Sequence, residues 1–102
     1  MDMAAIKNLA EGGKIKWSVH CAQRIMERGI SREDVLSCIA CGEIIEDYPN
    51  DFPLPSCLIF GITVAGKALH VVAGTDAEQI YIVTAYYPNT VKFEEDLKTR
   101  RT

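Results

Sequence analysis

Three polar side chains recur at four-residue spacing near the start of the chain: His20, Arg24 and Arg28. On an α-helix this spacing places them in one row. Guanidinium groups suit bidentate contact with phosphate, and imidazole transfers protons near neutral pH. The row therefore indicates a phosphate-handling surface, although polar residues at this spacing are also typical of a solvated helix face.

A second histidine, His70, lies in an apolar run that extends from Leu69 to Val72. Strand alternation places His70 and Val72 on one face, and Leu69 and Val71 on the other. If the Leu69 face packs against helices, His70 points to the open surface of a sheet, where a substrate could lie. The alternative is a hydrogen-bonded histidine with a structural role.

The neighbouring strands also carry polar side chains whose faces follow from the same alternation. Glu46 and Tyr48 are expected to share a face with Ile44. In the last strand one face is expected to carry Ile80, Ile82, Thr84 and Tyr86, and the other Tyr81, Val83, Ala85 and Tyr87. The sequence leaves open which of these faces is exposed.

Four cysteines raise the question of a metal or redox site. Cys38 and Cys41 form a C-x-x-C run, but Cys21 and Cys57 stand alone, and a structural zinc site needs four ligands. On a helix Cys38 and Cys41 lie one turn apart, which favours ordinary packing. We expect free thiols in a reducing compartment, no metal and no cofactor.

These side chains must be positioned by an α+β domain, which we expect to fill residues 1–102. Capping residues and glycines predict helices at 1–10, 18–28 and 31–41, with the last two forming a tight helical hairpin. Residues 14–17 are expected to be a brief extended piece, and 91–97 one helical turn. Strands are predicted at 43–48, 57–64, 68–74 and 79–87, so that the helices cover one face of a four-stranded antiparallel sheet.

Composition and charge exclude several classes of protein. The chain has 102 residues, 48% of them hydrophobic and 25% charged, which excludes a disordered chain, a collagen-like repeat and a coiled coil. The net charge of −3 excludes a uniformly basic nucleic-acid binder. Charge is segregated, however: residues 43–97 carry nine acidic and two basic side chains, while the helical part and residues 98–101 are basic. A phosphate-binding patch on an acidic body remains compatible with this pattern.

The chain shows no targeting signal. Residues 1–13 lack the apolar run of a signal peptide, and no stretch reaches the roughly 18 apolar residues of a membrane helix. We expect a cytoplasmic protein that does not enter the membrane.

Five motifs resemble those of a bacterial family of small domains of unknown function. They are W-S-x-H-x-x-x-R-x-x-x-R-G-I-S from Trp17, G-E-I-I-E-x-Y-P from Gly42, P-S-C-L from Pro55, L-H-V-V from Leu69, and Y-x-P-N from Tyr86 with Phe93, Asp96 and Arg100. The resemblance extends from about residue 15 to residue 101. Phe93 departs from the pattern, which usually has a tryptophan there.

That family is similar in fold to the RelE and ParE toxins and to colicin-type RNases. The resemblance implies helices followed by an antiparallel sheet, and a toxin paired with an antitoxin that carries a zinc finger. It also implies RNA as the substrate.

These observations suggest two alternative functions. The first is a metal-independent ribonuclease, which needs a base, an acid and cations for the phosphate. Its candidate catalytic residues are His20, Arg24, Glu46, His70 and Tyr86, and its candidate RNA-binding residues are Arg28, Lys98, Arg100 and Arg101. The second is a non-catalytic protein-interaction domain, which the acidic middle of the chain and its aromatic residues favour.

Overall fold

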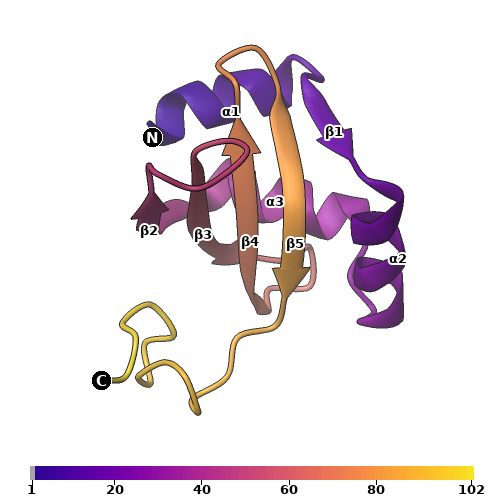
Figure 1. The fold of residues 1–102 in the computed structure, drawn as a ribbon. Coiled ribbons are helices and arrows are strands. Elements are labelled where there is room, and N and C mark those ends of the chain that lie inside the picture. Colours follow the sequence, from indigo (N-terminus) through magenta and orange to yellow (C-terminus); the bar gives the residue numbers. More distant parts are fainter. Residues whose placement is uncertain (1) are drawn as a thin grey trace.

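Three helices come before most of the sheet in the computed structural model, which describes residues 2–102 (Figure 1). The elements are α1 (Met3–Glu11), β1 (Ile15–Trp17), α2 (Val19–Glu27), α3 (Arg32–Cys41), β2 (Glu43–Tyr48), β3 (Ser56–Ile62), β4 (Ala68–Thr75) and β5 (Ile80–Tyr86). The α+β class is therefore confirmed. Met1, which we expected to open the first helix, lies outside the described residues.

Local capping explains where the helices begin. Asp2, Ser18 and Ser31 each accept a hydrogen bond from a backbone N–H in the first turn of the following helix. At α3 the Asp34 carboxylate also accepts from the Ser31 backbone N–H, which completes a capping box. The predicted starts of α2 and α3 are confirmed.

The sheet has five strands in the order β1-β5-β4-β3-β2, not the four that we expected. The short piece Ile15–Trp17 pairs in parallel with β5, and all other pairs are antiparallel. The prediction was wrong here because three residues have too weak a strand pattern on their own. Their backbone groups become a strand only when β5 is beside them.

Helices α2 and α3 each pack on a different part of the sheet instead of forming a hairpin. α3 packs against β3 and β4, whereas α2 packs against β5. Figure 1 shows α1 and α3 behind the sheet and α2 beside its β1–β5 edge. The predicted helical hairpin was wrong, because each helix buries its apolar face on a different part of the sheet.

Close packing of α3 on the sheet depends on Gly61 of β3. A Cβ atom added at Gly61 would overlap the backbone carbonyl oxygen of Cys38. The core on this side is aliphatic and includes Ile39, Ile59, Leu69 and Val71, all fully buried. Leu69 and Val71 thus face the helices, and His70 faces the other side of the sheet, which we call the open face.

Two β-bulges change which residues share the open face. In β2 the register shifts between Ile44 and Glu46, so Ile44 packs on the core while Glu46 pairs with Leu58 on the open face. A bulge adds one residue and reverses the alternation beyond it. The expectation that Glu46 and Tyr48 share a face with Ile44 was therefore wrong.

A second shift, between Val72 and Ala73 of β4, places the bulge at Val83 of β5. Ile80 and Ile82 lie in the core with Ala85, and Thr84 pairs with Val72. The predicted grouping of Thr84 and Tyr86 with Ile80 and Ile82 was wrong for the same reason.

The C-terminal segment, residues 88–102, covers one end of the open face. Figure 1 shows it leaving the lower end of β5 and folding beneath the sheet. It holds turns and an isolated bridge between Phe93 and Arg100 instead of the helical turn expected at 91–97. Phe93 is buried, as is Leu58 of the open face, and neither belongs to the helix-side core.

Candidate active site

His70 and Tyr86 form a hydrogen-bonded pair on the open face. The two residues are register partners on β4 and β5, and the His70 side chain has no exposed surface. His70 Nε2 lies 2.7 Å from the Leu97 carbonyl oxygen, which only accepts, so Nε2 carries the proton. In the neutral ring Nδ1 is then an acceptor, and the Tyr86 hydroxyl, 3.3 Å away, donates to it.

Burial sets the protonation of this pair. Burial lowers the pKa of His70 below its usual value, although the Leu97 carbonyl and Glu46 oppose the shift. Burial also raises the pKa of Tyr86. The resting pair is a neutral tyrosine that donates to a neutral imidazole, and Nδ1 is placed to accept the tyrosine proton.

Three aromatic rings enclose the His70 imidazole. Phe93 packs edge-on with ring centroids 4.6 Å apart, Tyr86 lies at 5.3 Å and Phe60 at 5.9 Å. Phe93 comes from the C-terminal segment, which also supplies the Leu97 carbonyl. The tautomer and the orientation of His70 are thus fixed by a segment distant in sequence.

Glu46 anchors the same segment. Both of its carboxylate oxygens accept from Arg100, at 3.0 Å from Nε and 3.0 Å from a terminal nitrogen, and the Tyr48 hydroxyl also donates to it. The Arg100 hydrogen bonds hold the pKa of Glu46 below its usual value, with a contribution from Tyr48. Burial and the bond to Glu46 raise the pKa of Tyr48 to about 12. Glu46 is therefore an ionised partner of Arg100, and this bidentate contact places it as an anchor.

A polar pocket of about 310 Å³ opens beside Tyr86. Its lining combines three cationic side chains with hydrogen-bonding and aromatic groups: Arg28, Tyr86, Asn89, Lys92, Phe93 and Arg100. Arg28 donates to Thr84 Oγ1 at 3.1 Å and to the Ala85 carbonyl at 2.7 Å. Both acceptors are neutral, and no ion pair to Arg28 is found among residues 2–102. A held guanidinium without an acidic partner, together with Lys92, makes this pocket suitable for an anion such as phosphate.

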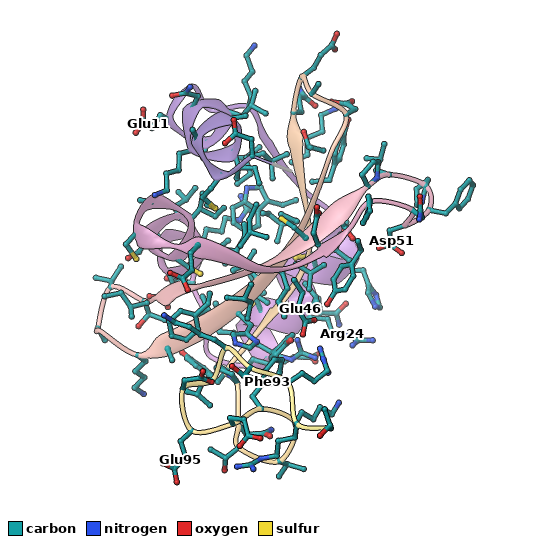
Figure 2. The ribbon with its side chains drawn as sticks, turned by 90° about the vertical axis from the view of Figure 1, so that its left-hand side faces the viewer. Glu11, Arg24, Glu46, Asp51, Phe93 and Glu95 are labelled. Atoms are coloured by element: carbon teal, nitrogen blue, oxygen red, sulfur yellow. The ribbon has the colours of Figure 1, made fainter. Side chains whose placement is uncertain are left out.

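The helical row predicted from the sequence is divided. Arg28 is the C-cap of α2 and reaches β5, whereas His20 and Arg24 are exposed and do not line the pocket. Figure 2 shows Arg24 and Glu46 above Phe93 and the C-terminal segment. The structure thus brings Arg28, His70, Tyr86, Glu46 and Arg100 to one end of the sheet and leaves His20 on the exposed helix surface.

The two other basic residues of the tail form ion pairs. Lys98 Nζ lies 3.1 Å from Glu43 and over the Phe60 ring, and Arg101 lies 2.8 Å from Glu94. Lys98 therefore ties the C-terminal segment to β2 and β3, much as Arg100 does through Glu46.

Asn89 and Lys92 are pocket residues that the sequence reasoning did not select. Asn89 belongs to the Y-x-P-N motif, which was the available signal. Lys92 is a single lysine in an acidic stretch, and nothing in its sequence context distinguishes it.

The cysteines do not form a ligand set. Cys38 is buried and lies 3.5 Å from the Leu69 carbonyl, whereas Cys41 is exposed. Burial raises the pKa of Cys38 to about 12 and that of Cys57 to about 11. Within residues 2–102 no three His, Cys, Asp or Glu side chains gather as metal ligands, and no described helix is long and apolar enough to cross a membrane.

One comparison with known proteins gives a match. The family model described as "Domain of unknown function (DUF4258)" matches residues 17–87. This range contains Arg28, Glu46, His70 and Tyr86, but not α1 or the C-terminal segment. No curated protein and no solved structure matches the chain.

Proposed function

Because the chain belongs to the family of domains of unknown function DUF4258, its activity must be argued from the site, and we propose that it is a metal-independent endoribonuclease. One observation carries the proposal: the hydrogen-bonded Tyr86–His70 pair borders a pocket that also holds Arg28, Lys92 and Arg100. Such an arrangement combines proton transfer with binding of a phosphodiester.

The chemistry assigns a role to each group. The ribose 2′-oxygen attacks the adjacent phosphorus, its proton passes to the Tyr86 oxygen, and the Tyr86 proton passes to His70 Nδ1. The 5′-oxygen leaves with the bonding electron pair and takes a proton from solvent water, and a 2′,3′-cyclic phosphate remains. Arg28 and Lys92 stabilise the charge that develops on the phosphate oxygens. The Leu97 carbonyl, which faces Nε2, favours the imidazolium that forms.

The other predicted residues keep wider roles in this proposal. His20 and Arg24 on α2 would contact the RNA strand beyond the pocket, and Glu46 with Arg100 positions the segment that holds His70. Lys98 and Arg101 would reach the RNA backbone only by sharing or leaving their carboxylate partners. The resemblance to RelE and ParE adds that this ribonuclease would be a cytoplasmic toxin paired with an antitoxin.

The test is cleavage of a single-stranded RNA by the purified full chain with EDTA present. Tyr86→Phe removes the proton-transferring hydroxyl and is expected to lower the rate about 100-fold or more. Tyr87→Phe is the matched control, since its hydroxyl contacts the Gly29 carbonyl outside the pocket. Arg28→Gln should lower the rate by a similar factor, whereas Arg32→Gln, whose arginine stacks on Trp17, should not. A wild-type chain that leaves RNA intact, or a Tyr86→Phe variant at full activity, contradicts the proposal.

A non-catalytic interaction domain is the second candidate, and a specific surface favours it. A hollow of about 400 Å³ along α2 is lined by Trp17, Val19 and Met26, and the last two are 85% and 77% exposed. Apolar side chains exposed together are typical of protein contacts. A 1:1 complex with a small protein that Met26→Ser abolishes, without RNA cleavage by the free chain, would favour this candidate.

A further inference from the structure

A second hollow lies on the open face, away from the proposed catalytic pocket. It has a volume of about 470 Å³ and is lined by the 51–54 loop, the start of β3, β4 and β5. Phe52 and Val83 on its lining are 92% and 55% exposed, and Tyr81 is partly exposed. We call it the aromatic groove. Exposed rings around a hollow of this size indicate a flat, apolar ligand group that stacks on them.

The aromatic groove and the polar pocket beside Tyr86, here called the catalytic pocket, lie along the same strand. Val83 lines the groove and Tyr86 lines the pocket, three residues farther along β5. At the rise of a β-strand this separation is about 10 Å. One or two nucleotides of an extended single strand cover that distance.

Cations lie at both ends of this path. Lys16 of β1 is the register partner of Tyr81, so its exposed side chain lies on the open face beside the groove. Arg28 lies at the other end, in the pocket. Aromatic side chains between basic ones are typical of surfaces that bind single-stranded nucleic acid, where rings stack on bases and cations contact phosphates.

One wall of the groove holds an oriented hydrogen-bond acceptor. The Ser56 hydroxyl donates to the Asp51 carboxylate at 2.6 Å, and both residues line the groove. An ionised carboxylate only accepts hydrogen bonds, so it pairs with the exocyclic amino groups of adenine, guanine and cytosine. Uracil offers no amino group and can donate only from its ring N3–H, so it is expected to bind less well.

We propose that the aromatic groove is a nucleobase subsite for single-stranded RNA, specific for bases with an amino group, and that Phe52 stacks on the base. The proposal rests on the proposed function, because it treats the base as part of a strand whose phosphate occupies the catalytic pocket. A basic peptide with apolar side chains is the competing occupant, since Asp51 is the charged residue of the lining.

The test is binding of mononucleotides to the full chain, monitored through the NMR chemical shifts of its backbone amides. AMP, GMP and CMP are expected to shift the Phe52, Ser56 and Val83 amides, UMP to do so at higher concentration, and ribose 5-phosphate not at all. Phe52→Ala should weaken AMP binding about tenfold, a loss within the range for one stacked base. Phe52→Tyr keeps the ring and should bind as wild type. Because Phe52 is almost fully exposed, these variants are expected to fold.

Val64→Ala serves as a remote control, since Val64 is exposed in the β3–β4 turn outside the groove. The subsite is overturned if ribose 5-phosphate shifts the groove amides as the nucleotides do. It is also overturned if a basic apolar peptide shifts these amides and the nucleotides do not. If the chain cleaves RNA and Phe52→Ala cleaves every sequence as wild type does, the subsite is wrong and the ribonuclease stands. If nucleotides bind in the groove but RNA is not cleaved, the subsite stands and the ribonuclease is wrong.

Discussion

The side chains on the two faces of the sheet are held in place by different kinds of contact. On the helix side, fully buried aliphatic side chains such as Ile39, Ile59 and Val71 pack without direction. On the open face, the contacts around His70 are directed hydrogen bonds, ring contacts and ion pairs. Packing that depends on volume alone makes a stable platform, whereas directed contacts fix the positions of reactive groups. The difference supports the proposal that function lies on the open face.

The largest effect is expected on the helix side, at Gly61. In Gly61→Ala the new Cβ overlaps the Cys38 carbonyl oxygen, so α3 must move off β3. The free energy of unfolding should fall by about 3 kcal/mol or more, as for severe overpacking. Gly74→Ala is the control, since the Cβ there meets its nearest atom, the Pro55 carbonyl oxygen, at 3.4 Å. Equal urea midpoints for the two variants would contradict the packing difference.

A smaller effect is expected at the ion pair on the open face. Arg100→Gln should lower the free energy of unfolding by about 1 kcal/mol, because the Arg100 side chain is 50% exposed and solvent screens the pair. The Glu46 pKa is depressed by Arg100, so this stabilisation is complete above the usual pKa of 4.5 and declines below it until folded Glu46 is protonated as well. Urea denaturation of wild type and variant at pH 7 and pH 3 checks the prediction. A difference as large at pH 3 as at pH 7 would show that charge is not the cause.

His70 gives a pH effect in a separate range. Its folded pKa lies below the usual 6.5, so the unfolded chain binds the proton first as the pH falls below 6.5. Stability is therefore complete above 6.5 and declines below it until folded His70 is protonated as well. The chain has two histidines, so His20→Gln leaves His70 alone for NMR titration. A midpoint at or above 6.5 would contradict the enclosed, neutral imidazole.

The smallest effect concerns the cysteines. A thiol reagent added to the native chain should label Cys41 quickly and leave Cys38 and Cys57 unlabelled until the chain unfolds, because burial raises their pKa values to about 12 and about 11. Cys41→Ser should change the free energy of unfolding by less than about 0.5 kcal/mol. Mass spectrometry after a short labelling pulse is the measurement, and rapid labelling of Cys38 would show that the helix-side core is open.

The sequence by itself determined the local elements. Ser18 and Ser31 mark the helix starts because a cap bonds to its own next turn, and β2 runs from Glu43 to Tyr48 as its pattern predicts. The family motifs contained Arg28, Glu46, His70 and Tyr86, so the sequence identified most residues of the candidate site, although not how they are arranged. These signals are local, since each depends on neighbours within a few positions.

Only the tertiary structure decided how these elements meet. The parallel pairing of β1, the bulges at Ile45 and Val83 and the burial of His70 under Phe93 all arise from contacts between distant parts of the chain. A bulge is favoured by the fit between two strands, and no single strand encodes it in its alternation. For that reason the sequence could place Glu46 and Tyr86 on strands, but the fold alone put both beside His70 and separated them from His20.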